Sequence, residues 1–369
     1  MTRARSLNEA GHGWPAATAP PRLAGMIAAS PPSAPPPGFT ADPTWFPFFL
    51  DLEADALTWV RIEAEALRAA SFLDQRALTP AAPRRTTAWR DAATLPAGAR
   101  RDAQYIFHIG HVGSTLLSRL LGERPDVLAL REPLILRAFA EALRDGRWGS
   151  GEASRLDTLT ALLSRTFRPE QRALIKATSF TSEIADRLLP GGSRALFLTV
   201  TPRAYIETIL GGDASRRELA LLTPSRLRRL ARRCPGLALD PDRLSEAQKA
   251  AVGWACETTS LARAGAALGE ERVLWIDFDR FLARPAETLV RAGAFLDHSL
   301  ELRDAEALCS GPLMRRYSKA LEYEYSPALR SEVLADARRR FGRDIDAALA
   351  DLAAMGQRWP AMAAVLERS

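Results

Sequence analysis

The sequence predicts an α/β protein in which a parallel sheet of about five strands carries helices on both faces. Short apolar runs of strand length alternate with longer segments of helical periodicity between residues 105 and 296. Several of these runs end in a charged residue or run into a glycine loop, which is typical of the ligand side of an open sheet. The composition, 47% hydrophobic and 25% charged, is that of a globular chain.

The part of the chain before this sheet is expected to form two segments. Residues 1–40 are rich in alanine, proline and glycine, which predicts a disordered leader. Arg3 and Arg5 precede an apolar stretch that hints at a secretory signal, but the stretch is short and contains a glycine, so the expected location is cytoplasmic.

Residues 41–100 are interpreted as a helical hairpin followed by a linker, and residues 101–369 as the main domain with C-terminal helices. The apolar residues expected on the packed side of the hairpin are Leu57, Val60, Ile62, Leu67 and Phe72.

The first strand of the main domain is expected at residues 105–107, and the helix after it at Ser114 or Thr115, where leucines recur at helical spacing. Further strands are expected at residues 125–130, 173–176, 195–200 and 272–276. Helices are expected after Pro133, at residues 152–166, after Arg203, at residues 215–267 and 285–296, and over about the last sixty residues, with a polar interruption at 315–319.

The stretch from Gly110 to Thr115 (GHVGST) links the first strand to its helix and is a candidate anion site. Glycine allows a close backbone approach, the first-turn N–H groups lack intrahelical partners, and the helix dipole favours negative charge. The nucleotide triphosphatase pattern GxxxxGK[ST] would require a lysine after Gly113, and the chain has Ser114 there. An ordinary strand–turn–helix connection remains an alternative for this stretch.

The net charge indicates the kind of ligand, and the cysteine spacing excludes some kinds of site. The net charge of +6 suits an anionic ligand. The cysteines at 234, 256 and 309 form no CxxC or Cys–His pattern, which argues against a zinc site and a disulfide framework and fits a reducing compartment. No apolar run approaches the length of a membrane span.

The glycine loop resembles the 5′-phosphosulfate loop [RK]-S-G-T-T-L-L of sulfotransferases. The matching residues are His111, Val112, Gly113, Ser114, Thr115, Leu116 and Leu117, with His111 in place of the basic residue and Val112 in place of the serine. His111 can donate a hydrogen bond and can carry charge when protonated. The resemblance implies the phosphate-loop NTPase-like version of the α/β fold.

Further segments are similar to the same family. Residues 271–296 look like its late strand and helix, with Asp277 and Asp279 near the acidic position, and residues 200–208 look like its 3′-phosphate segment, R-N-P-R-D-x-x-x-S. Pro202 and Arg203 match that segment, Thr208 replaces the serine, and Val200 stands where the leading arginine would be. Arg131-Glu132-Pro133 and Lys176 resemble elements of tyrosylprotein and bacterial sulfotransferases.

The resemblance implies transfer of a sulfuryl group from 3′-phosphoadenosine 5′-phosphosulfate (PAPS) to a hydroxyl or amine acceptor, without a metal, a nucleic-acid partner or a membrane span. It implies three catalytic residues: Glu132 as general base, Lys176 as stabiliser of the bridging oxygen, and His111 as a loop residue that contacts the ligand. The residues implied to bind the nucleotide are Gly110, His111, Val112, Gly113, Ser114, Thr115, Leu116, Arg203, Thr208, Arg315, Arg316 and Lys319.

Two other functions stay open at this point. A phosphate-loop kinase or triphosphatase would need the missing lysine and an acidic magnesium ligand. A catalytically eroded relative that only binds nucleotide is suggested by His111 and Val200.

The arginine cluster at 226–233 is interpreted as a solvated helix face, or as a site that recruits an anionic acceptor. The acceptor and the oligomeric state are not predicted.

Overall fold

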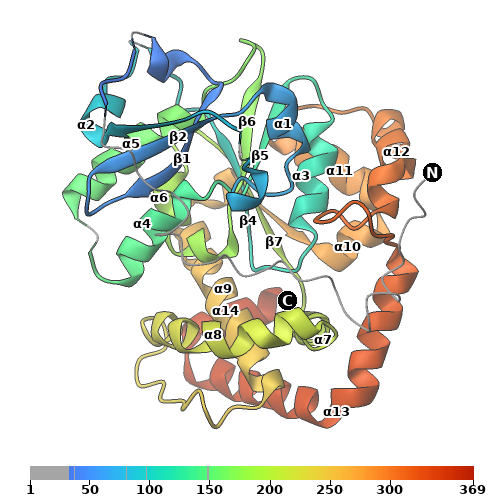
Figure 1. The fold of residues 1–369 in the computed structure, drawn as a ribbon. Coiled ribbons are helices and arrows are strands. Elements are labelled where there is room, and N and C mark those ends of the chain that lie inside the picture. Colours follow the sequence, from blue (N-terminus) through green and yellow to red (C-terminus); the bar gives the residue numbers. More distant parts are fainter. Residues whose placement is uncertain (1–32, 37, 80, 97, 148) are drawn as a thin grey trace.

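A computed structural model describes residues 33–369 apart from 37, 80, 97 and 148, and it confirms the α/β class (Figure 1). The main sheet has five parallel strands in the order β5-β6-β4-β7-β8, and each lies where the sequence predicts a strand. The strands are β4 (Gln104–His108), β5 (Val127–Arg131), β6 (Arg172–Lys176), β7 (Ala195–Thr199) and β8 (Val273–Asp277).

Helices cover both faces of this sheet. Figure 1 shows α3 and α11 on one side and α6 and α9 on the other. The segment expected to be helical at 215–267 forms two helices, α8 and α9, which pack against each other. The helices of this domain are α3 (Ser114–Gly122), α4 (Ile135–Arg144), α5 (Ser150–Leu163), α6 (Ala185–Leu188), α7 (Pro202–Leu210), α8 (Asp213–Ala231), α9 (Glu246–Leu268), α10 (Phe278–Ala283) and α11 (Pro285–Phe295).

Strand order and register decide where the polar strand ends meet. β4 lies between β6 and β7, so the loop after β4 opens where the order of connections reverses, the usual ligand position in such sheets. Lys176 at the end of β6 is in register with Ile106 on one side and with Arg131 on the other. Glu132, which follows Arg131, is therefore placed beside Lys176.

The predicted helical hairpin at 41–100 is wrong. Those residues form a three-stranded antiparallel sheet with the short helices α1 (Ala64–Ala69) and α2 (Trp89–Ala92). Its strands are β1 (Trp45–Asp51), β2 (Ala56–Arg61) and β3 (Arg84–Ala88). β2 is buried at five successive positions, so the alternation of polar and apolar residues that identifies a strand is missing. Its Thr, Trp and Val residues nevertheless favour β structure.

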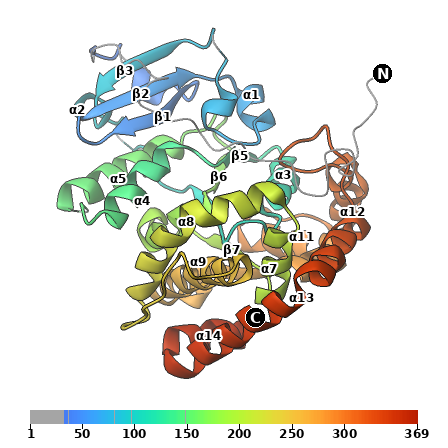
Figure 2. The ribbon, with the colours of Figure 1, turned by 60° about the horizontal axis from the view of Figure 1, so that its bottom comes forward.

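This N-terminal sheet packs on α4 and α5, as Figure 2 shows above the main domain. Arg165, just after α5, donates hydrogen bonds to the backbone oxygens of Thr40, Asp42 and Trp45. Burial lowers the pKa of Arg165 to about 10. Residues 1–32 of the predicted leader lie outside the described residues, while Phe39 is buried against Trp45 and Trp59.

The C-terminal part is helical, as expected, and the polar residues 315–319 interrupt it. Its helices are α12 (Leu302–Ser310), α13 (Pro327–Arg358) and α14 (Pro360–Arg368). α13 packs on α7 and α9, which brings its first turn close to the β4 loop. Among the described residues, no helix combines the length and apolar character needed to traverse a bilayer.

We predict that Arg165→Ala lowers the free energy of unfolding by about 2–3 kcal/mol, because three carbonyl groups lose a charged donor at the join between the sheets. Urea denaturation measures the change. Arg101→Ala is the matched control, since Arg101 forms an exposed ion pair with Asp157 and should cost less than about 1 kcal/mol. Equal losses in the two variants would contradict the role given to Arg165.

Candidate functional site

The loop after β4 turns the backbone sharply before α3 begins. Gly110, His111 and Gly113 have positive φ angles of 87°, 56° and 64°. Gly113 is the N-cap residue of α3 and provides no side-chain cap, so the first-turn N–H groups of the helix are left for another acceptor. The glycine loop therefore has the backbone form of an anion site.

Gly113 cannot be replaced without strain. A Cβ atom built on it would lie 1.9 Å from the ring of Phe278, the first residue of α10. The left-handed φ adds a conformational cost for any other residue type. The loop is thus held against α10 by a contact that depends on the absence of a side chain.

Two buried donors near the loop have no protein partner in the part of the chain that the structure describes. The Thr115 hydroxyl is buried in the first turn of α3 and makes no hydrogen bond. Arg330, in the first turn of α13, pairs with Asp279 through Nη1 at 2.6 Å, but its buried Nη2 makes no hydrogen bond. Unsatisfied buried donors are costly, so a ligand that accepts from both would stabilise this arrangement.

A small cavity of about 60 Å³ lies over the loop. Its wall includes a segment that we call the covering hairpin, residues 315–325, in which the N–H of Tyr317 donates to the Tyr323 oxygen at 2.9 Å. The lining residues are His111, Val112, Gly113, Ser114, Thr115, Leu116, Thr208, Phe278, Arg316, Tyr317, Ser318, Lys319, Tyr325 and Arg330.

Most of the residues predicted to bind nucleotide meet in this cavity. The loop residues 111–116, Thr208, Arg316 and Lys319 line it, while Gly110 lies behind it, near Ser179. The Thr208 hydroxyl donates to the Ala204 oxygen at 2.7 Å, so it presents lone pairs rather than a free proton.

Two predicted cations point elsewhere. Arg203 pairs with Asp346 on α13 at 2.8 Å, and Arg315 donates to the Ser310 oxygen and lines a separate cleft. The nucleotide-binding role that the resemblance implies for Arg203 is therefore not supported by its position outside the cavity lining. Arg330 occupies the cavity instead, and no pattern in the sequence marked it, because it lies more than a hundred residues beyond the loop in an ordinary helix start.

His111 is neutral rather than cationic. Its burial, together with Lys319, Arg226 and Lys176, lowers its pKa to about 3. The pKa of His108 is also well below its usual range through burial and the same lysines, and its Nδ1 accepts from the Gly110 amide at 3.0 Å. Of the two properties that the sequence offers for His111, hydrogen bonding and charge when protonated, the lowered pKa leaves hydrogen bonding near neutral pH.

Lys176 and Glu132 form an ion pair beside the loop. The Lys176 side chain is fully buried, and burial lowers its pKa to about 8 while Glu132 opposes that shift. Glu132 has a left-handed φ of 51°, and its N–H donates to the Lys176 oxygen at 2.6 Å. Neither side chain lines the cavity, but Lys176 is close enough to affect the pKa of both His108 and His111.

The arginine cluster at 226–233 is a solvated face only in part, since Arg228 and Arg232 are exposed and the other arginines are not. Arg229 is buried and pairs with both Glu257 and Glu183, and Arg233 also pairs with Glu183. These contacts join α8, α9 and the segment before α6, so Arg229 and Arg233 serve the core. Arg226 is only partly buried and contributes to the potential around His111.

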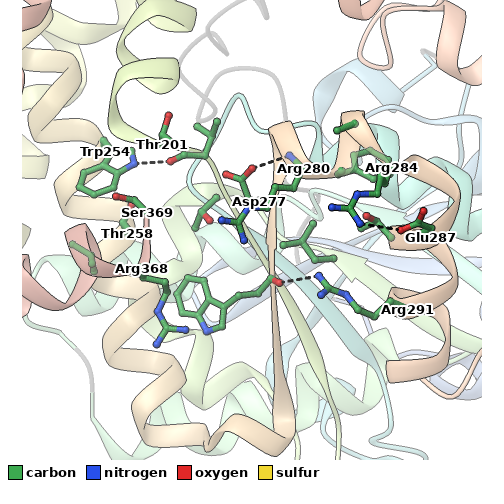
Figure 3. Close-up of a pocket in the computed structure, with 18 residues that line it drawn as sticks. Thr201, Trp254, Thr258, Asp277, Arg280, Arg284, Glu287, Arg291, Arg368 and Ser369 are labelled. Atoms are coloured by element: carbon green, nitrogen blue, oxygen red, sulfur yellow. Dashed lines mark hydrogen bonds and ion pairs between the residues drawn. The ribbon is translucent and has the colours of Figure 1, made fainter.

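Larger clefts lie outside the loop. One of about 550 Å³ lies at the edge strand β8, and Figure 3 shows Arg280, Arg284, Arg291 and Arg368 among the side chains that line it. Another of about 750 Å³ adjoins the loop cavity and is separated from it by Arg316 and Tyr325. The β8 cleft contains none of the predicted site residues. We place the site in the smaller cavity because the loop, the cations and the unpaired donors converge there.

Comparisons with known proteins returned structures alone, since no family model and no curated protein matches the sequence. A sulfotransferase domain from the curacin biosynthetic pathway is 17% identical with a TM-score of 0.41, covering 64% of this chain and 90% of its own. A sulfotransferase from Alicyclobacillus acidocaldarius is 18% identical with a TM-score of 0.36, covering 67% and 96%. A retinol dehydratase in complex with androsterone and the inactive cofactor PAP is 12% identical with a TM-score of 0.30, covering 69% and 84%. Scores this low do not establish a ligand or a reaction for this chain.

We predict that Gly113→Ala lowers the free energy of unfolding by about 2–4 kcal/mol, because the new Cβ overlaps Phe278 and the backbone stays left-handed. Adding Phe278→Ala should recover the steric part of that loss. Thermal denaturation measures both, with Gly342→Ala as the control, since a Cβ there meets nothing within 4 Å. A Gly113→Ala variant as stable as the Gly342→Ala variant would show that the loop is not held as described.

Proposed function

We propose that this protein is a sulfotransferase that uses PAPS as its donor. The observation that carries the proposal is the convergence on one cavity of an uncapped helix N-terminus, the cations Arg316, Lys319 and Arg330, and the unpaired Thr115 hydroxyl. Such a site suits an anion with several phosphate or sulfate oxygens. The buried Lys176–Glu132 pair beside it supplies an acid and a base.

The donor set fits the phosphate groups of the nucleotide. The amides of residues 113–115, the Thr115 hydroxyl and Arg330 would hold the 5′-phosphate, while Arg316, which also lines the adjoining cleft, is the cation offered to the 3′-phosphate. A cavity of about 60 Å³ accommodates a phosphate-sized group but not a whole nucleotide. The nucleoside would therefore extend toward the adjoining cleft, with movement of Arg316 and Tyr325.

PAPS supplies a sulfuryl group that is transferred by in-line displacement, with the new bond to the acceptor oxygen or nitrogen forming as the bond to the 5′-phosphate oxygen breaks. Lys176, protonated near neutral pH, would stabilise charge on the departing phosphate oxygen. His111, neutral at the same pH, can donate a hydrogen bond to the transferring group without adding charge. Beyond these interactions, the residues of the site would contribute by holding the donor and the acceptor in line for the transfer.

Glu132 would accept the proton that the acceptor loses. Its carboxylate forms an ion pair with Lys176 beside the loop, and a positioned carboxylate is a usual general base. Its left-handed backbone is strain of a kind often found at active sites. Removal of the base typically costs about 10²- to 10⁴-fold in rate. We propose a hydroxyl or amine acceptor, a cytoplasmic location, and a reaction that needs neither metal nor nucleic acid.

Two alternatives make different predictions. A phosphate-loop kinase or triphosphatase would bind ATP with magnesium, although residue 114 is serine where that pattern has lysine. A catalytically eroded relative would bind 3′,5′-adenosine bisphosphate (PAP) without transferring sulfuryl groups, and Val200 together with the outward-facing Arg203 favours that possibility.

We predict that PAP raises the melting temperature by several degrees and that ATP with magnesium does so far less. A ligand at about 100 times its dissociation constant stabilises the folded state by about 2.7 kcal/mol, which a thermal-shift assay detects readily. The Thr115→Val variant should lose part of the PAP effect, because a buried donor to the phosphate is removed. A larger shift with ATP and magnesium would favour the kinase alternative.

We predict that sulfuryl transfer falls about tenfold for each pH unit above pH 8, because the protonated form of Lys176 is lost as the pH rises through its pKa of about 8. Transfer from radiolabelled PAPS to a panel of hydroxyl and amine acceptors measures the profile. Lys176→Met should lower the rate at pH 7 by about 10²- to 10³-fold. Lys249→Met, on the first turn of α9, is the matched control and should leave the profile unchanged. PAP binding without transfer in the parent protein would favour the eroded relative.

A further inference from the structure

Arg119 links the helix that follows the glycine loop to two segments remote in sequence. Its Nε donates to the Ser318 oxygen of the covering hairpin at 3.0 Å. Its Nη2 donates to the Ser71 hydroxyl at 2.7 Å and to the Ala69 oxygen at 3.3 Å. One guanidinium therefore joins α3, the covering hairpin and the end of α1 in the N-terminal sheet unit.

This guanidinium is buried without a carboxylate partner. Arg119 is 7% exposed, and burial lowers its pKa, with Glu123 opposing the shift only at longer range. In the described part of the chain, the three hydrogen bonds of Arg119 all go to neutral oxygens and none goes to a carboxylate. A buried charge compensated in this way is a poor source of stability. We therefore explain the hydrogen bonds of Arg119 by their effect on position: they hold the covering hairpin and the end of α1 against α3.

The hydrogen bond between Arg119 and the Ser318 oxygen lies next to the two cations of the covering hairpin that line the cavity. Ser318 directly precedes Lys319 and lies two residues after Arg316, and both cations line the cavity. A bond to the Ser318 oxygen fixes the peptide group that joins Ser318 to Lys319. It therefore restricts the directions that the Lys319 side chain can take.

Arg131 also binds the end of α1, the segment that Arg119 contacts. It is buried at the end of β5, and its guanidinium donates to the Ala70 oxygen at 2.7 Å and also to the Arg68 oxygen. Residues 68–70 end α1, whose last carbonyls carry the partial negative charge of the helix dipole and suit two arginine donors. The N-terminal sheet unit thereby supports the wall of the cavity.

We propose that Arg119 is a positioning residue for nucleotide binding that acts through Lys319. By bonding the Ser318 carbonyl and the end of α1 together, Arg119 holds the covering hairpin over the glycine loop so that Lys319 faces the bound phosphate or sulfate oxygens. This inference rests on the proposed function, because the nucleotide is the ligand that Lys319 would meet. It also makes the N-terminal sheet unit a structural part of the binding site.

The test is a double-mutant cycle measured by calorimetric titration with PAP. Lys319→Ala should weaken binding about tenfold through the loss of a charge-assisted bond, and Arg119→Gln should do the same. The double variant should bind no more than about twofold more weakly than either single variant, since both remove one interaction. Additive losses, about a hundredfold together, would overturn the proposal.

Arg124→Gln is the matched control. Arg124 lies just after α3 and pairs with Asp126 at 2.9 Å, and among the described residues it has no hydrogen bond to the hairpin. Its loss should combine additively with that of Lys319. If Arg119→Gln does not fold, Ser71→Ala takes its place in the cycle, because it loosens the guanidinium while leaving Arg119 present.

A second measurement does not need ligand. Trypsin should cleave after Arg316 or Lys319 several-fold faster in Arg119→Gln than in Arg124→Gln, because the hairpin is released. Equal cleavage rates would overturn the positioning role even where PAP binds. Faster cleavage in a protein that binds no PAP would keep the structural link but would contradict both the nucleotide and the role of Lys319 toward it.

Discussion

The left-handed turn at Gly113 is the constraint on which the rest of the site depends. It ends the loop after β4 and starts α3 without a side-chain cap, so the helix presents unpaired N–H groups to the cavity. The ring of Phe278 lies where a Cβ would project, which ties the loop to the start of α10. The position of every other cavity residue is then defined relative to a rigid turn. A rigid turn of this kind suits a site whose chemistry consists mostly of positioning and charge stabilisation.

Positive charge in this site comes from segments that are far apart in the chain. Arg316 and Lys319 come from the covering hairpin, Arg330 from α13 and Lys176 from β6. Burial, together with Lys176 and Lys319, lowers the pKa of both His108 and His111. Lys176 is a lysine in a chain that otherwise uses arginine almost throughout. An ammonium group shifts its pKa more readily than a guanidinium on burial, which suits a residue that must balance charge beside Glu132.

Each failure of the sequence reasoning has a physical cause. β2 is covered on both faces, so its pattern shows no alternation and its apolar residues were assigned to a helix. Arg203 follows the expected proline, but the long helix α13 passes close by and offers it Asp346. Arg330 and Arg119 act through contacts across many residues, and local patterns carry no information about such contacts. Arg229 was taken as exposed because the acids that bury it lie on other elements.

Local chemistry in the sequence was enough to determine the parallel sheet, the glycine turn before α3 and the two charged strand ends, since strand length, glycine and helix periodicity act over a few residues. The sequence also placed Thr208, Arg316 and Lys319 among the candidates for one ligand. Tertiary structure alone decided that Arg330 joins them, that Arg203 and Arg315 do not, and that His111 is uncharged. The reason is physical: burial and packing across the fold set which side chains share a cavity and which of them stay ionised, and neither quantity exists before the chain has folded.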